Sequence, residues 1–208
     1  MNQRSVASEA AKRGFDVLVS FAALVMLSPL LLWVALRISR DSPGPVFFRQ
    51  ERVGRDGVPF RIHKFRTMVH DAPTLGLPLT VAGDARITRA GDWLRAKRID
   101  ELPQLIDVLM GSMSLVGPRP EVPRWVAHYP DELRQRVLAV RPGITDPSTL
   151  AYIDEATLLA RAADPEREYI EVVLPRKLAA AADYADRAPL WSDIGVLCRT
   201  FALLLRPG

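Results

Sequence analysis

One apolar stretch constrains this chain more than any other feature of its sequence. Residues 15–38 read "FDVLVSFAALVMLSPLLLWVALRI". As a helix rising 1.5 Å per residue, this stretch is long enough to cross a hydrocarbon core of about 30 Å. A secretory signal is disfavoured, because the apolar run is too long and no small-residue cleavage site closes it. The sequence therefore predicts a helix that associates with a membrane.

Two features of this stretch argue against a simple membrane span. Ser28 and Pro29 lie near its middle, where proline removes a backbone donor and bends or breaks a helix. Both flanks are basic, through Lys12, Arg13, Arg37 and Arg40. The positive-inside tendency draws both flanks to the cytoplasmic side, so a helix over about 12–40 that enters, bends and returns satisfies both features. Each arm would be about 20 Å long, too short to cross alone. A proline-kinked span and a buried helix of a soluble protein are the alternatives.

Composition sets broader bounds. The 208 residues suffice for one domain with a sizeable core. The formal net charge of +4 fits anionic partners such as phosphates, nucleotides or acidic lipids, without choosing among them. Cys198 is the only cysteine, so no intrachain disulfide can form and a reducing environment is expected.

A β-hairpin is predicted after the apolar stretch. Residues 46–52 and 58–65 are rich in β-branched and aromatic side chains. The residues that mark the turn between them are Gly54, Asp56 and Gly57. Residues 71–84 contain two prolines and two glycines, and are predicted to form a loop.

Helices are predicted for much of the rest. Residues 84–99 form one, and its candidates for the buried side are Ile87, Trp93 and Leu94. Another starts at Asp100 and ends at Gly111, with apolar residues at helical spacing at Leu102, Leu105, Ile106 and Leu109. Further helices are expected over 131–139, 153–163, 164–185 and 190–206. The last of these suits a helix lying in the membrane interface, with packing against the core as the alternative. Residues 114–123 should form an extended, proline-stiffened turn, and 140–147 a loop.

The adjacent acids Asp100 and Glu101, in "RIDELPQL", admit two interpretations. Asp is a preferred N-cap, acids favour the first helical turn and Pro103 is tolerated there, so a helix start explains the pair without chemistry. The cations nearby in the sequence are Lys64, Arg66, Arg95, Lys97, Arg98 and Arg119. A carboxylate at a helix start ringed by cations stays ionised, at a place where phosphate oxygens would also be held. A metal ion can offset the repulsion between these anions.

Several long motifs in a fixed order give the chain a family resemblance. "KFRTM", "LRAKRIDELPQLIDVLMGSMSLVGPRP" and "VRPGIT" follow the Ser-Pro-interrupted segment. Together they resemble the bacterial sugar transferases and, more narrowly, the small monotopic phosphoglycosyl transferases. The resemblance is dense over 11–145 and weaker beyond, where "DYADRAPLWSDI" still matches. After "VRPGIT" many members continue with a tryptophan-containing segment and a Gln-Val-Asn run. This chain reads "DPSTLAYIDEATLLA" there, so no sugar-binding residue is assigned.

The resemblance implies an activity and roles for particular residues. Such enzymes transfer a phospho-sugar from a UDP-sugar to a polyprenol phosphate and release UMP, in the first membrane step of polysaccharide or glycoconjugate assembly. Asp100 is implied to be the nucleophile, which forms a covalent phospho-sugar intermediate, and a ligand of Mg²⁺. Glu101 is implied to be its acid–base partner. The residues implied to orient phosphates are Lys64, Arg95 and Arg119, and the implied helix-breaking pair is Ser28 and Pro29.

The resemblance also implies the architecture and the location. The expected fold is α+β and mainly helical, with an N-terminal re-entrant helix, a small β-hairpin, a catalytic helix and interfacial amphipathic helices. Residues 1–208 would form one domain, with the re-entrant helix at about 12–40 and a cytoplasmic catalytic globule at about 41–208, on a bacterial inner membrane. The expected partners are the UDP-sugar, the polyprenol phosphate and membrane lipid, but no nucleic acid. The oligomeric state is left open, and a homodimer is compatible with the sequence.

Other functions and sites are weighed against this one. A classical glycosyltransferase with a lipid-linked acceptor would release UDP rather than UMP. A non-catalytic membrane scaffold would not need the full set of candidate catalytic side chains. His63, His70 and His128 lack the spacing of metal ligands, which disfavours a zinc site. His63 is expected on the hairpin surface, and Asp107 is expected to be solvated.

Overall fold

The computed structural model describes residues 6–75, 83–146, 158–159, 161–187 and 190–204. The helices are α1 (Val6–Asp41), α2 (Arg89–Ala96), α3 (Gln104–Met110), α4 (Pro123–Val126), α5 (Asp131–Leu138), α8 (Pro165–Glu168), α9 (Leu174–Arg187) and α10 (Leu190–Leu204). The strands are β1 (Phe47–Val53), β2 (Pro59–Phe65), β3 (Ser114–Val116) and β4 (Gly143–Thr145). Short 3₁₀ turns occupy Arg55–Gly57, Ala72–Thr74 and Ile99–Glu101, and a π-helical turn, Tyr169–Val173, joins α8 to α9. The prediction of a mainly helical α+β fold with a small hairpin is confirmed.

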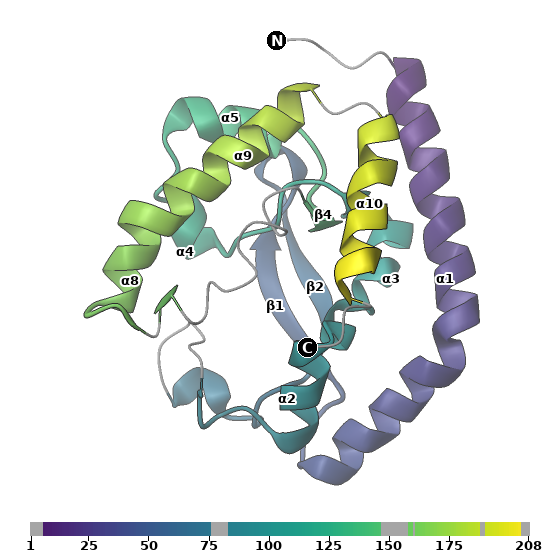
Figure 1. Ribbon diagram of the computed structural model, residues 1–208, viewed down its shortest axis with the longest axis vertical. Coiled ribbons are helices and arrows are strands. Elements are labelled where there is room, and N and C mark those ends of the chain that lie inside the picture. The colour runs from purple at the N-terminus through teal and green to yellow at the C-terminus, as the bar shows by residue number, and fades with distance from the viewer. Residues whose placement is uncertain (1–5, 76–82, 147–157, 160, 188–189, 205–208) are drawn as a thin grey trace.

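Helix α1 runs along one side of the molecule and changes direction in its C-terminal part (Figure 1). It continues through Pro29, although the proline has no N–H to donate to the carbonyl of Val25. The Ser28 hydroxyl donates to that carbonyl instead, at 2.8 Å. The described backbone of α1 therefore stays helical across the Ser-Pro pair. The return of the chain to the same membrane face stays a prediction.

The surface of α1 is mostly apolar and uncovered. This helix is long and apolar enough to cross a membrane, and only 11% of its most apolar 18-residue window is buried in the rest of the chain. A core helix of a soluble protein would be mostly buried, so that alternative is disfavoured.

The basic N-terminal end of α1 is bonded to the rest of the molecule. Arg13 donates from Nη1 to the carbonyl of Val108 at 2.6 Å and from Nη2 to that of Leu109 at 3.1 Å, at the C-terminal end of α3. Lys12 forms an ion pair with the buried Asp193 of α10. These contacts attach the predicted membrane helix directly to α3 and α10.

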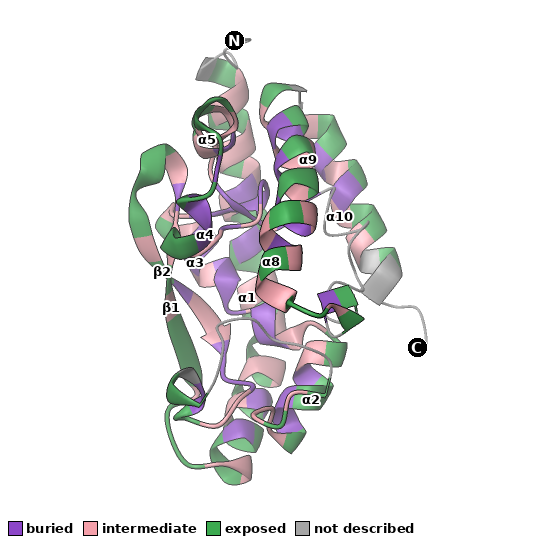
Figure 2. Cartoon of the chain, turned by 90° about the vertical axis from the view of Figure 1, so that its left-hand side faces the viewer, coloured by how far each residue is buried: buried purple, intermediate pink, exposed green. Residues whose placement is uncertain are grey.

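The hairpin lies on one face of the molecule, where most of β1 is exposed (Figures 1 and 2). Strands β1 and β2 pair antiparallel, with Phe47 opposite Phe65 at one end and Val53 opposite Pro59 at the other. A second, parallel pair joins β3 to β4, in a region predicted as turn and loop. A Cβ atom on Gly143 would lie only 2.1 Å from the Gly117 nitrogen, so the two backbones approach as closely as they do because this residue is glycine. The turn that carries Arg119 is fixed by this crossing.

The buried apolar side chains form three clusters among the described residues. One lies between α4, α5 and α9, one joins the hairpin to α3, β3 and α10, and one lies where α1 meets β2 and α2. Members of the last two include Ile62, Val108, Met113, Val34, Phe65 and Leu94. Figure 2 shows buried residues concentrated where these elements face one another. The inner face of the hairpin is thereby packed against α3.

Several helix predictions need correction at their ends or faces. The helix predicted over 84–99 is confined to α2, because Ile87 pairs with Met68 in a β-bridge. Leu94 is buried as predicted, but Trp93 is 41% exposed. The helix predicted to begin at Asp100 begins at Gln104, after the 3₁₀ turn, and ends at Gly111 (φ +91°) as predicted.

The helices predicted after residue 130 agree more closely with the structure. Helix α5 matches the helix predicted over 131–139, and α8, the π-helical turn and α9 together match 164–185. The helix predicted over 153–163 falls mostly outside the described residues, as does part of the loop predicted over 71–84. Helix α10 packs Val196 inward while Trp191 at its start is 81% exposed, so it has one face on the core and one free.

Candidate active site

Asp100 and Glu101 lie in the 3₁₀ turn between α2 and α3. Arg98, just before them, adopts a left-handed conformation (φ 52°), which turns the chain sharply away from α2. Both acids are buried, at 3% and 7% exposure. Neither caps α3, because Pro103 holds the N-cap position and no side chain bonds to that end of the helix. The prediction that Asp100 caps the following helix is therefore wrong, although both acids do lie in the first turn of the 3₁₀ segment.

Three cations surround the two carboxylates. Lys64 Nζ, from β2, lies 2.9 Å from Asp100 Oδ2 and 3.3 Å from Glu101 Oε1, so one ammonium bridges both acids. Arg119 donates from Nη2 to Glu101 Oε1 at 2.5 Å and from Nη1 to Oε2 at 3.4 Å. Arg98 Nη1 lies 3.9 Å from Glu101 Oε2. Elements far apart in the sequence thus converge on one acidic pair.

The electrostatics hold Glu101 as an anion. Burial by itself would raise the pKa of Glu101, but the charges of Arg119, Lys64 and Arg98 together outweigh it, and the pKa lies well below its usual range. Glu101 in turn raises the pKa of the Arg119 guanidinium. Because a carboxylate with a lowered pKa accepts a proton poorly, Glu101 in this arrangement mainly holds the cations in place.

This shift predicts a specific dependence of stability on pH. A lowered pKa in the folded state gives stability that is fully present above the unfolded pKa of about 4.3 and is lost as pH falls below it. In Glu101→Gln this loss is absent, so the free energy of unfolding should fall less steeply from pH 5 to 3. The difference in slope should reach about 1.4 kcal/mol per pH unit. Denaturant titrations in detergent at several pH values measure it, and equal slopes would contradict it.

Arg95 is not brought onto the acidic pair. Within the described part of the chain no ion pair joins it to Asp100 or Glu101. Its charge adds instead to the lowering of the pKa of Asp84, which is caused chiefly by the hydrogen bond from Arg86. Arg98 takes the place beside Glu101 because helix α2 ends at Ala96 and the backbone then turns left-handed.

A second charged network fixes the turn that carries Arg119. Arg52 donates to the carbonyl of Pro120 at 2.9 Å and pairs with Glu121 at 3.7 Å. The Tyr169 hydroxyl donates to Glu121 Oε1 at 2.7 Å. Sequence reasoning missed Arg52 and Glu121, although Glu121 directly follows the "GPRP" motif. These residues position Arg119 by holding its backbone against β1.

His63 and Asp107 were predicted to face solvent, but the structure pairs them with each other and largely buries both. Asp107 is 1% exposed and accepts hydrogen bonds from the His63 backbone N–H at 2.8 Å and from its ring Nδ1 at 2.7 Å. With that proton on Nδ1, Nε2 accepts from Arg49 at 2.6 Å. The pair locks α3 onto β2, which keeps Lys64 beside the acids.

Arg66 serves the fold rather than the acidic pair. It is 4% exposed, and its guanidinium donates to the carbonyls of Ser42, Pro43 and Gly44. These contacts tie the end of β2 to the segment that follows α1.

The carboxylates of the acidic pair suit a hard cation such as Mg²⁺. No group of three His, Cys, Asp or Glu side chains suited to a metal lies among the described residues. Mg²⁺ commonly binds through one or two carboxylates, with substrate phosphates and water completing its ligands. Asp100 fits that pattern. Lys64 contacts its Oδ2, and no hydrogen bond or ion pair to its Oδ1 is found among the described residues.

Comparison with known proteins adds to this geometry. The family model described as "Bacterial sugar transferase" matches residues 7–207. A UDP-glucose:undecaprenyl-phosphate glucose-1-phosphate transferase of Caulobacter vibrioides is 39% identical over 204 residues, which cover 96% of this chain and 72% of that protein. A UDP-N-acetylgalactosamine-undecaprenyl-phosphate N-acetylgalactosaminephosphotransferase of Aeromonas hydrophila is 37% identical over 196 residues, covering 93% and 43%. The exopolysaccharide production protein PSS of Rhizobium leguminosarum bv. phaseoli is 51% identical over 109 residues, covering 52% and 54%. The matched region thus spans between 43% and 72% of the length of these relatives.

Proposed function

This chain belongs to the bacterial sugar transferase family, and we propose that it transfers a phospho-sugar from a UDP-sugar to a membrane polyprenol phosphate. The products are a polyprenyl-diphospho-sugar and UMP. The observation that carries the proposal is the buried acidic pair bridged by Lys64 and clamped by Arg119, in a chain that also has a long apolar helix. The names of the relatives, which join a UDP-sugar to undecaprenyl phosphate, support the substrate classes.

The first step is a displacement at the sugar-bearing phosphorus. Asp100 attacks it with a carboxylate oxygen, the phosphoanhydride bond to UMP breaks, and UMP leaves with the electron pair. A phospho-sugar ester of Asp100 remains. Lys64 and Arg119 suit this step, because their donors can pass from the carboxylates to the phosphate oxygens as the nucleotide enters.

The second step restores the enzyme. An oxygen of the polyprenol phosphate attacks the same phosphorus, the bond to Asp100 breaks and the carboxylate is freed. When phosphates share Lys64 and Arg119 and add negative charge, the pKa of Glu101 rises from its lowered value. Glu101 can then accept the proton of an incoming phosphate monoester, which is the acid–base role that we propose for it. Arg95, half-buried on α2, is proposed to meet phosphate oxygens farther from the reacting phosphorus.

Release of UMP, as distinct from UDP, tests this function. The protein in detergent or lipid nanodiscs is incubated with a panel of UDP-sugars and a polyprenol phosphate, and the nucleotide product is identified. Release of UMP together with a lipid-linked diphospho-sugar is expected for at least one UDP-sugar. UDP as the product would mean a classical glycosyltransferase, and no turnover with any sugar would favour a scaffold.

Mg²⁺ is the proposed cofactor, held by Asp100 together with oxygens of the diphosphate. It would supply positive charge where two anionic groups must approach to bonding distance. Lys64 and Arg119 offset only part of that charge, so removal of Mg²⁺ with excess chelator should reduce UMP release at least about 10²-fold. Added Mg²⁺ should restore it. Full activity in excess chelator would contradict this cofactor.

We propose the re-entrant arrangement for α1, with the rest of the chain on the cytoplasmic face of a bacterial inner membrane. Both basic flanks, and the position of Pro29 inside the helix, support it. Single cysteines at Ser5 and Ser42, in a Cys198→Ser background, should react with a membrane-impermeant reagent from the same side. Labelling from opposite sides would establish a spanning helix. Pro29→Leu, which restores the missing donor, should straighten α1 and shift the labelling toward that outcome.

A further inference from the structure

A separate cavity of about 310 Å³ lies where the C-terminal part of α1 meets α2. Its polar and aromatic lining comes from Trp33 and Arg37 of α1 and from Arg89 and Trp93 of α2. Val34 and Leu94, exposed by no more than 1%, form its apolar floor. The partners of Asp100 and Glu101 are Lys64, Arg98 and Arg119, and none of these lines the cavity. The cavity is therefore distinct from the acidic site.

The two tryptophans have the character of a membrane interface. Trp33 and Trp93 are 48% and 41% exposed, yet they contact each other edge to face, with ring centroids 5.7 Å apart. Tryptophan gathers at the boundary between lipid and water, because its ring is apolar and its N–H is polar. This contact also explains why Trp93 does not join the core.

The charge of the cavity comes from Arg37 and Arg89. Both are exposed, and neither forms an ion pair with a carboxylate in the parts of the chain that the structure describes. The backbone donors at the start of α2 are already used, since Asp41 accepts from the Ala90 N–H at 3.0 Å and Thr88 accepts from Gly91. Positive charge in the cavity is therefore that of two guanidiniums, which suit the paired oxygens of a phosphate.

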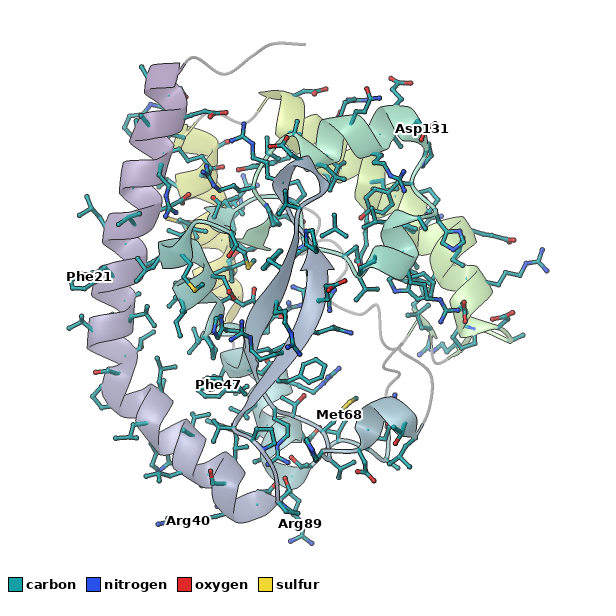
Figure 3. The ribbon with its side chains drawn as sticks, turned by 180° about the vertical axis from the view of Figure 1, so that it is seen from behind. Phe21, Arg40, Phe47, Met68, Arg89 and Asp131 are labelled. Carbon is teal, nitrogen blue, oxygen red and sulfur yellow. The ribbon has the colours of Figure 1, made fainter. Side chains whose placement is uncertain are left out.

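The position of the cavity along α1 indicates what would fill it. Large apolar side chains exposed on this helix include Phe21, Met26, Leu32 and Leu36. Figure 3 shows Phe21 projecting outward from α1, while Arg40 and Arg89 both lie toward the far end of the molecule, near the C-terminal end of α1. The cavity thus lies where the apolar surface of α1 gives way to charge. In a membrane this is the level of the lipid headgroups.

We propose that this cavity binds the phosphate headgroup of an anionic phospholipid. Arg37 and Arg89 hold the phosphate, the tryptophan pair covers the glycerol region, and the acyl chains lie along α1. A bound lipid would hold α1 against α2, the helix that leads through Arg98 into the acidic turn. It would be a resident lipid and not the acceptor, because the acceptor phosphate must reach Asp100.

Native mass spectrometry of the purified full chain tests the site. The protein in detergent is titrated with phosphatidylglycerol or with phosphatidylcholine. One phosphatidylglycerol per chain should be retained, and phosphatidylcholine should be retained less. Arg37→Gln combined with Arg89→Gln should weaken phosphatidylglycerol binding about tenfold or more. The double change to lysine should weaken it less. Arg40→Gln is the matched control, because it removes an exposed arginine at the same end of α1 that does not line the cavity, and it should leave binding unchanged.

Four results would overturn the proposal. Equal retention of the two lipids would remove the charge requirement, and an equal loss in Arg40→Gln would mean diffuse attraction to the basic end. Displacement of the lipid by inorganic phosphate at similar concentration would make the site one for free phosphate. Displacement by polyprenol phosphate at lower concentration than phosphatidylglycerol would make it an acceptor site. UMP release by the double glutamine variant is measured in parallel. This measurement reports on the proposed catalytic function and lipid retention reports on the cavity, so failure of one can be told from failure of the other.

Discussion

Asp100→Asn should abolish both UMP release and formation of a phospho-sugar adduct, lowering turnover by about three orders of magnitude or more. An amide is a poor nucleophile, and it cannot balance the charge of Lys64, which lies 2.9 Å from Asp100 Oδ2. In the wild type, incubation with Mg²⁺ and a UDP-sugar without acceptor should release up to one UMP per chain. Mass spectrometry of the digested protein should then find the phospho-sugar on the peptide that contains Asp100.

The control for this variant is Asp92→Asn. Asp92 is an exposed acid on α2, a short distance before the acidic pair in sequence. It has the same side chain, and within the described parts of the chain no ion pair joins it to a cation. It should release UMP at the wild-type rate and form the adduct normally. Near wild-type turnover in Asp100→Asn would mean that the pair serves only the fold. UMP release at full rate without any adduct would favour direct attack by the acceptor on the UDP-sugar.

Glu101→Gln separates the two steps of the proposed reaction. If Glu101 handles the proton of the acceptor, release of the first UMP should be nearly retained while transfer to polyprenol phosphate slows strongly. Rapid-quench measurements with and without acceptor distinguish the two rates. The amide also leaves the donors of Arg119 less well matched, so the first step should slow slightly, and much less than the second.

Features set by local sequence could be predicted. The length and apolar character of α1, the hairpin and the end of α3 at Gly111 depend on neighbouring residues. The motif resemblance likewise placed Lys64 and Arg119 with the acidic pair, and the structure brings these residues together. The backbone of Arg98 departs from the helical phase, so its side chain, and not that of Arg95, contacts Glu101.

Features set by distant contacts could not be predicted. Asp107 reads as a solvated acid on a helix, and only the packing of α3 on β2 gives it His63 as a partner. Strands β3 and β4 are three residues each and far apart in sequence, so no periodic pattern signals their pairing. Arg66 lies in a motif of cations, yet its partners are backbone carbonyls after α1, which carry no sequence signal.

Arg119→Lys should lower kcat/KM about 10²-fold, although the charge is kept. The guanidinium reaches both oxygens of Glu101 through two nitrogens, at 2.5 and 3.4 Å, whereas an ammonium offers one point of contact and cannot hold that geometry. Arg124→Lys is the matched control, because Arg124 is exposed and pairs with Glu166 through one nitrogen outside the acidic site. It should have little effect.

Arg119→Met extends this test to the charge itself. Arg119 exerts the strongest of the charge effects that lower the pKa of Glu101, so its removal should raise that pKa toward the ordinary value or above it. Glu101 would then become protonated at higher pH, and Lys64 would lose part of the charge that it bridges. The acidic limb of the pH dependence of kcat/KM should therefore move to higher pH in Arg119→Met and stay in place in Arg124→Met. An unshifted limb in Arg119→Met would mean that the ionisation of Glu101 does not govern the reaction, and that Arg119 acts on the substrate alone.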